Sequence, residues 1–244
     1  MEKQYRIEDE DWRLQGITTI RAVVNPWPGM QTRPGDVMKV VAPDTKYNDM
    51  DITLGIPSAV ALFLDIAFSA FQGVAQMRET AVAKRDKTYI PDDLTFPYFE
   101  RVMTAIVFSF TALESFANEE IPPDHVYHKR RRRIFAALTK GSIERQVNLD
   151  TKLGDILPDV MKIESPKGTP LWTDYLRLKE DRDRIIHLKS CDREALYHGP
   201  PSIWHRFFSA SLPHYPEISR GMIAHFQARR DERRVPRWFK LLPF

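Results

Sequence analysis

The sequence predicts a mainly α-helical protein: an antiparallel helical bundle with a small N-terminal β hairpin or extended arm. From residue 56 onward, long segments with helical spacing of apolar residues follow one another, separated by loops that contain proline or glycine. Residues 1–55 instead hold two short runs rich in β-branched residues, divided by turn formers. We therefore expect a β-rich arm over residues 1–55 and a helical bundle with a basic C-terminal helix over residues 56–244.

Composition fits a chain that folds in a reducing compartment. The 244 residues are 43% hydrophobic, which is enough to build a core, and 28% charged, which is ordinary for a folded protein. A single cysteine, Cys191, excludes an internal disulfide framework. The first residues are charged where a signal peptide needs an apolar core, so we expect a cytoplasmic protein.

One apolar segment, residues 56–76, has the length of a membrane span. Its polar members, Asp65, Ser69, Gln72 and Gln76, are spaced by four, three and four residues, which places them on one face of a helix. A charge in the middle of a bilayer costs about 3 kcal/mol on insertion scales. We therefore expect an amphipathic helix of a bundle and no membrane contact.

The expected elements follow from turn and cap signals. The β runs cover residues 17–25 and 37–42. The expected helices cover residues 57–84, 97–121, 125–141, 151–162, 170–189, a short segment after Ser202, and 216–234. Thr169 followed by Pro170 is an N-cap with proline in the first turn. Asp124 predicts the start of the 125–141 helix, and Gly141 predicts its end.

The helix that begins at Pro170 has a charged residue in its apolar stripe. The stripe contains Leu171, Tyr175, Leu178 and Ile185. Arg182 occupies the position between the last two, and Asp183 and His187 lie four residues apart on a neighbouring face. A buried guanidinium without a partner is costly, so Arg182 needs an ion pair or a function. A structural ion pair for Arg182 and a boundary position for His187 are the alternative interpretation.

The helix that begins near Pro97 is apolar on most sides between Val102 and Phe116, yet it carries a polar stripe. Thr111, Glu114 and Asn118 are spaced by three and four residues. Buried polar groups need partners, so we expect Glu114 to form an ion pair with Arg182 across packed helices.

These residues resemble a known family. The run RDRIIH, Arg182 to His187, resembles the Arg-x4-His motif of HEPN (higher eukaryotes and prokaryotes nucleotide-binding) domains. The run ALESFANE at 112–119 is similar to a segment on an earlier core helix of bacterial HEPN proteins, so the resemblance covers about residues 97–189. Arg220 and His225 have the same spacing, but glycine follows that arginine, and the segment belongs to a basic helix.

The resemblance implies a metal-independent endoribonuclease that uses the ribose 2′-hydroxyl as nucleophile and leaves a 2′,3′-cyclic phosphate. It implies a homodimer, with the site formed where two domains meet, and a toxin or defence role. His187 would transfer protons, Arg182 would neutralise charge on the phosphorane, Asp183 would orient the motif and Glu114 would hold Arg182. Thr111, Asn118 and Tyr175 would support the site, and no cofactor or metal is expected. A catalytically silent HEPN-like module that binds nucleotide or protein, and a helical scaffold without a site, are the alternatives.

Charge is distributed unevenly along the chain. Residues 1–124 hold 12 Lys/Arg against 19 Asp/Glu, and residues 125–244 hold 24 against 14. The densest basic run is Lys129, Arg130, Arg131, Arg132 and Arg133, which we expect to contact RNA phosphates unless it is simply a solvated surface. His125 and His128 lie three residues apart without a nearby cysteine, so we expect no zinc site there. The expected partners are RNA and a second copy; the sequence names no antitoxin or regulatory protein.

Overall fold

The structure is a computed structural model that describes residues 10–19, 31–34, 37–39, 41–131, 134–193, 202–230 and 235–243. The chain divides into two compact units. The N-terminal unit contains residues 1–62 and 231–244, and the helical unit contains residues 63–230. The C-terminal tail therefore groups with the N-terminal segment, whereas the sequence predicted that it would belong to the bundle.

The N-terminal unit holds two antiparallel ribbons in the predicted β-rich region. Strands β1 (Ile17–Thr19) and β2 (Val37–Lys39) form one ribbon, and β3 (Val41–Tyr47) and β4 (Met50–Gly55) form the other. Asn48 and Asp49 join β3 to β4 with φ angles of 47° and 62°, as the tight turn of a hairpin requires. Arg237, in helix α10 (Arg237–Lys240), donates hydrogen bonds to the carbonyls of Glu10 and Asp11, which ties the tail to this unit.

The helical unit is built around a 29-residue helix, α3 (Asp92–Glu120). The predicted 57–84 helix is two helices, α1 (Ala59–Phe71) and α2 (Val74–Ala83), because Gly73 adopts φ 77° between them. The remaining α-helices are α4 (Lys140–Gln146), α5 (Leu149–Thr151), α6 (Leu157–Met161), α7 (Pro170–Ile186), α8 (Ile203–Phe207) and α9 (Tyr215–Gln227). A π-helical turn, Lys152–Ile156, joins α5 to α6.

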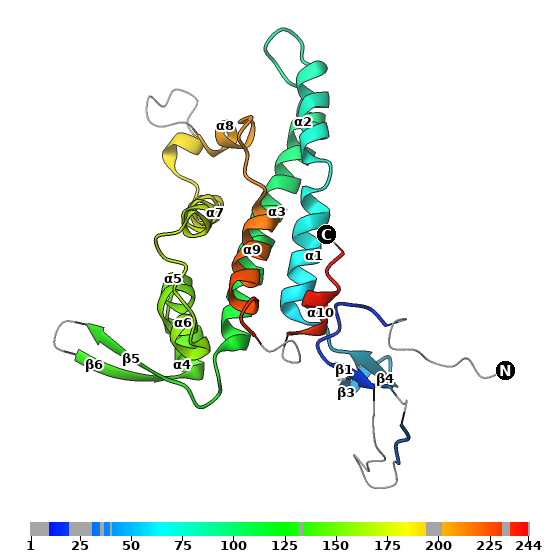
Figure 1. The fold of residues 1–244 in the computed structure, drawn as a ribbon. Coiled ribbons are helices and arrows are strands. Elements are labelled where there is room, and N and C mark those ends of the chain that lie inside the picture. Colours follow the sequence, from blue (N-terminus) through cyan, green and yellow to red (C-terminus); the bar gives the residue numbers. More distant parts are fainter. Residues whose placement is uncertain are drawn as a thin grey trace. The chain divides into compact units, whose positions relative to one another are not determined.

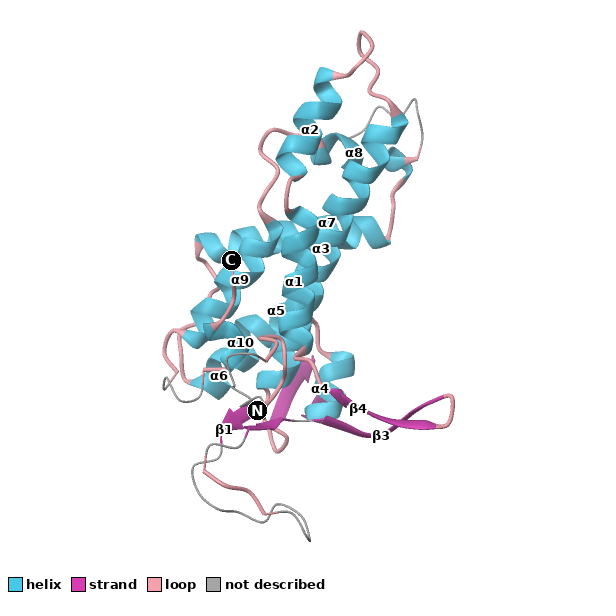
Figure 2. Ribbon diagram, turned by 90° about the vertical axis from the view of Figure 1, so that its right-hand side faces the viewer, coloured by secondary structure: helices cyan, strands magenta, loops and turns pink. Residues whose placement is uncertain are grey.

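Helix α3 packs against α2, α7 and α9, and α7 packs against α8 and α9 (Figure 1). The contact between α3 and α7 confirms the prediction that the 97–120 and 170–189 helices pack together. Their shared core includes the fully buried side chains of Phe116, Tyr175 and Phe226. Helix makes up most of the described chain (Figure 2), so the predicted mainly α fold is confirmed.

The predicted helix over residues 125–141 is wrong. The chain instead forms an antiparallel hairpin of β5 (Val126–Arg131) and β6 (Ile134–Thr139). Gly141 does not end a helix there, because it is the second residue of α4. Both strands begin with β-branched and aromatic residues, which favour extended backbone. The cationic run that follows in β5 has no apolar side chains that a helix could bury.

Among the described residues, one helical stretch, Ala59–Ala83, is long and apolar enough to cross a membrane by length and composition. Of its most apolar window, 28% is buried. The predicted amphipathic helix without membrane contact therefore stays a prediction.

Candidate functional site

The Arg-x4-His motif lies at the C-terminal end of α7. This helix begins as predicted, with the Thr169 hydroxyl accepting a hydrogen bond from the amide of Trp172 at 3.3 Å. It ends at Ile186, and His187 caps it with φ −127° and ψ 70°, its amide donating to the carbonyl of Asp183 at 2.9 Å. The His187 side chain is exposed. The motif therefore spans the last turn of a helix and the residue that leaves it.

The Arg182 guanidinium has two neighbours. Its Nη1 donates to Oδ1 of Asp183 at 3.0 Å, and its Cζ lies 4.6 Å from the ring centroid of Phe110, a buried residue of α3. A cation over an aromatic face is held by the charge distribution of the ring. The side chain of Arg182 remains 31% exposed, so the guanidinium is fixed at the α3–α7 contact and still reaches solvent.

The predicted ion pair between Glu114 and Arg182 is wrong. Among the described residues, the acidic group paired with Arg182 is Asp183. Glu114 follows Phe110 by one helical turn on α3, and its charge acts on Lys152. Arg182 therefore packs against α3 one turn before Glu114, where an aromatic ring takes the place of the expected carboxylate.

The polar stripe of α3 is satisfied mainly by Lys152, the first residue of the π-helical turn. Lys152 is 1% exposed, and its Nζ donates to Oδ1 of Asn118 at 2.8 Å and to the Glu144 carbonyl at 3.1 Å. Burial lowers the pKa of Lys152, and the nearby charges of Glu114 and Glu144 partly restore it. Thr111 needs no partner from another helix, because its hydroxyl donates to the Val107 carbonyl one turn earlier.

The hydroxyl of Tyr175 has a hydrogen-bond partner that is not part of the Arg-x4-His motif. The ring is fully buried, and the hydroxyl donates to Oδ1 of Asp150 at 2.5 Å. Lys179 pairs with the other carboxylate oxygen of Asp150. Burial and the neighbouring Asp150 carboxylate raise the pKa of Tyr175. The hydrogen bond from Tyr175 to Asp150 joins α7 to α5, and the charges of Asp183 and Glu114 also raise the pKa of Tyr175. The supporting role of Tyr175 at the site stays a prediction.

The buried charges of α7 are Asp181 and Arg184, whereas the sequence pattern indicated Arg182. Asp181 accepts a hydrogen bond from the Tyr215 hydroxyl at 2.8 Å and pairs with Arg206 at 2.7 Å. Arg184 pairs with Asp192 at 2.7 Å. No local signal could reveal these residues, because Arg206, Tyr215 and Asp192 are supplied by later segments of the chain.

The other segments with Arg-x4-His spacing differ from the α7 motif. Arg220 pairs with Glu217 at 2.6 Å, and Nε2 of His225 lies 3.0 Å from the Glu164 carbonyl, so both side chains have structural partners. Arg193 and His198 also have this spacing, and a glutamate follows that arginine. His198 lies outside the described residues.

The predicted RNA-binding run falls largely outside the described part of the chain. Lys129, Arg130 and Arg131 belong to β5, but their side chains are not described, and Arg132 and Arg133 lie outside the described residues. No group of three or more His, Cys, Asp or Glu side chains that could hold a metal ion occurs among the described residues.

No protein-family model, curated protein or solved structure matches the chain. The end of α7 presents a fixed, partly exposed guanidinium, a carboxylate and an exposed imidazole within six residues. Such a set can bind a phosphate and transfer a proton without a metal.

Proposed function

We propose that this protein is a metal-independent endoribonuclease of the HEPN type, acting as a homodimer in the cytoplasm as a toxin or defence effector. The observation that carries the proposal is the Arg182 guanidinium, held by Asp183 and by the Phe110 ring while still 31% exposed. A solvent-reaching arginine in the last turn of a helix and an exposed histidine that follows the helix are groups that phosphoryl transfer to an internal hydroxyl can use.

In the proposed reaction, His187 of one copy accepts the proton of the ribose 2′-hydroxyl. The 2′-oxygen attacks the adjacent phosphorus, and the bond from phosphorus to the 5′-oxygen breaks. His187 of the second copy donates a proton to the leaving 5′-oxygen, which leaves a 2′,3′-cyclic phosphate. Arg182 uses one N–H on Asp183 and has further N–H donors for the phosphorane oxygens.

The second candidate is a catalytically silent module that binds nucleotide or protein. Two observations favour it. Asp183 and Phe110 already hold the Arg182 guanidinium without a substrate, and the charge of Glu114, its predicted partner, acts on Lys152. The two candidates differ in one measurable respect, because a silent module would bind RNA or a partner without cleaving RNA.

The test is incubation with mixed RNA in EDTA, followed by analysis of fragment ends. We expect 2′,3′-cyclic phosphate termini. His187→Ala should slow cleavage about a hundredfold to ten-thousandfold, because it removes the proton-transfer group. Arg182→Ala should also inactivate the protein, and circular dichroism should show that both variants remain helical.

The histidines of the other two Arg-x4-His segments, His225 and His198, serve as controls. His225→Ala should cleave nearly as fast as the parent protein, because His225 hydrogen-bonds a backbone carbonyl. His198→Ala should do the same if the α7 motif is the catalytic one. Cleavage that requires Mg²⁺, or full activity of the His187 variant, would overturn the proposal.

A further inference from the structure

Glu114 is a carboxylate without a direct partner beside the Arg-x4-His motif. It lies on α3 and is half-buried, and among the described residues no hydrogen bond or ion pair reaches its side chain. Its negative charge acts on the buried ammonium of Lys152, but no hydrogen bond joins the two groups. A carboxylate that has lost part of its hydration is stabilised by N–H or O–H donors. The two oxygen atoms of Glu114 can therefore accept hydrogen bonds from a ligand.

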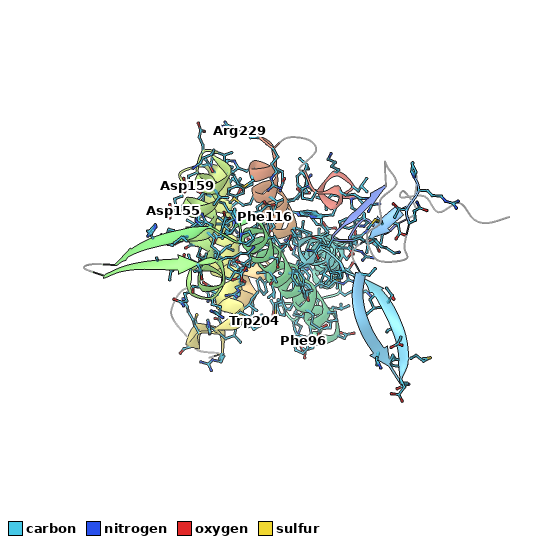
Figure 3. All side chains as sticks on the ribbon, turned by 90° about the horizontal axis from the view of Figure 1, so that it is seen from below. Phe96, Phe116, Asp155, Asp159, Trp204 and Arg229 are labelled. Atoms are coloured by element: carbon cyan, nitrogen blue, oxygen red, sulfur yellow. The ribbon has the colours of Figure 1, made fainter. Side chains whose placement is uncertain are left out.

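Glu114 lies on the side of α3 that faces away from α9. Phe110, Glu114 and Asn118 are spaced by four residues, so they share one face of the helix. Phe116, labelled in Figure 3, is turned by about 200° from Glu114 around the helix axis. The Phe116 ring packs against Phe226 of α9, with 5.8 Å between the ring centroids. The face that carries Glu114 is therefore the one that meets α7 and the π-helical turn.

Two cationic side chains flank Glu114 along this face. The Arg182 guanidinium lies 4.6 Å from the ring centroid of Phe110, one turn before Glu114. Lys152 donates a hydrogen bond to Asn118, one turn after Glu114, at 2.8 Å. One helical turn is about 5.4 Å along the axis, so a ligand of the size of one nucleotide can contact Arg182 and Glu114 together.

The Tyr175 hydroxyl relates Glu114 to the motif from the other side of the helix contact. Burial and Asp150 raise the pKa of this hydroxyl most, and the negative charges of Asp183 and Glu114 raise it further. Asp183 in turn accepts the hydrogen bond from Arg182. The Arg182–Asp183 pair and the Glu114 carboxylate therefore lie around one hydroxyl at the α3–α7 contact and belong to one site.

The chemistry of this carboxylate selects among the parts of an RNA. It repels phosphates, which Arg182 attracts, so its ligand must be a sugar or a base that donates hydrogen bonds. The Watson–Crick edge of guanine presents two adjacent N–H donors, from N1 and from the 2-amino group, which match the two oxygens of one carboxylate. Adenine and cytosine present one amino group beside an acceptor nitrogen, and uracil presents one N–H between two carbonyl oxygens. Proteins read the bases of single-stranded RNA on this edge.

We propose that Glu114 recognises guanine in the nucleotide next to the phosphate that Arg182 binds. The N1–H and the 2-amino group of the base each donate one hydrogen bond to the carboxylate. Because Arg182 and Glu114 lie on helices that pack together, guanine occupies one fixed position beside the cleaved bond. This inference rests on the proposed ribonuclease function and gives it a base preference.

The test maps the cleavage of an RNA pool of randomised sequence in EDTA, followed by kinetics on short RNAs with a single cleavage site. We expect guanine at one position beside the cleaved bond. Replacing this guanine by inosine, which lacks the 2-amino group, should lower kcat/KM about ten- to hundredfold, because one hydrogen bond to a charged group is lost.

Glu114→Gln should change the preferred base from guanine to adenine. The amide oxygen accepts from the 6-amino group of adenine and the amide N–H donates to N1, whereas guanine would place a donor against that N–H. The variant should therefore lose the guanine preference and cleave the adenine RNA faster than the guanine RNA. Glutamine has the shape of glutamate, and circular dichroism checks that the variant is folded.

Glu144→Gln is the matched control, because Glu144 also places a negative charge near Lys152 but lies exposed on α4. This variant should keep the guanine preference. Cleavage without a base preference, or an unchanged guanine preference in the Glu114 variant, would overturn the inference and leave the proposed ribonuclease function intact.

If no RNA is cleaved, the proposed function fails and binding decides the inference. Fluorescence anisotropy then compares short RNAs of repeating guanosine–uridine with those of repeating inosine–uridine. Tighter binding of the guanosine RNA by the parent protein, lost in the Glu114 variant, supports recognition of guanine. Equal binding of the two RNAs by the parent protein overturns it.

Discussion

At the scale of single residues, buried charged side chains are paired with each other, and the clearest pair joins the end of α7 to the segment that follows it. Arg184 and Asp192 have side chains that are 8% and 0% exposed, and they are joined at 2.7 Å. Burial by itself would raise the pKa of the Asp192 carboxyl. Hydrogen bonds from Arg184 and from the amides of Ile203 and Lys189 outweigh burial and lower the pKa to about 2.

Asp192→Asn should lower the free energy of unfolding by about 3 kcal/mol at pH 7, because it removes the buried carboxylate that pairs with the Arg184 guanidinium. Since the folded pKa of about 2 lies below the ordinary 3.8, the contribution is present above pH 3.8 and is lost as pH falls toward 2. Urea unfolding from pH 7 to pH 2 should show the two proteins converging. Asp159→Asn, at an exposed pair with Lys162, should change stability too little to measure. A pH-independent difference would contradict the assignment.

At the scale of elements, the sequence predicted the helix starts that are set by neighbouring residues. The N-cap residues Thr169 and Ser202 mark the starts of α7 and α8, since each cap is made by residues within three positions. The β5–β6 hairpin was missed because its ladder joins residues up to thirteen apart, from Val126 to Thr139, and Asp124 and Gly141 resembled helix ends. The π-helical turn is also set by packing, because it brings Lys152 against α3.

Lys152→Met should destabilise the helical unit by about 1–3 kcal/mol at pH 7, because Asn118 and the Glu144 carbonyl lose a buried donor. Burial lowers the folded pKa of Lys152 below 10.5, so the unfolded chain binds more protons between the two values. Stability of the parent protein should therefore rise with pH across that window, and the variant should lack this rise. Urea titrations between pH 7 and pH 10.5 measure this rise in the free energy of unfolding. Lys162→Met, at an exposed site, should keep the rise; equal slopes in all three proteins would refute the role of Lys152.

At the scale of the whole molecule, the candidate site shows which features the spacing of residues predicts and which it does not. The spacing of apolar residues predicted that the motif lies on a helix, because helical spacing is a local property. That helix packs against α3. The spacing assigned the wrong partner to Arg182, because the contact with Phe110 depends on how two helices cross. Nothing in the spacing of residues fixes that crossing.

The face of α7 that carries the motif also has uncovered apolar side chains, and from this we predict a twofold homodimer. Leu176 precedes Asp183 by seven residues, so the two lie on one face of the helix, and His187 follows the last residue of the helix. Leu176 is 43% exposed and Ile186 is 52% exposed in the single chain. An isologous contact over the exposed side of α7 would cover both side chains and bring two copies of His187 toward a shared site, as a composite site requires.

Sedimentation velocity at micromolar concentration should show a dimer for the parent protein. Leu176→Glu should shift it to a monomer, because two like charges would be brought together at the twofold axis, and it should reduce RNA cleavage in parallel. Tyr89→Glu, at a side chain that is 58% exposed elsewhere in the helical unit, is the matched control and should leave the dimer intact. A parent protein that stays monomeric yet cleaves RNA would separate the catalytic motif from the dimer, and one copy of His187 would then have to perform both proton transfers.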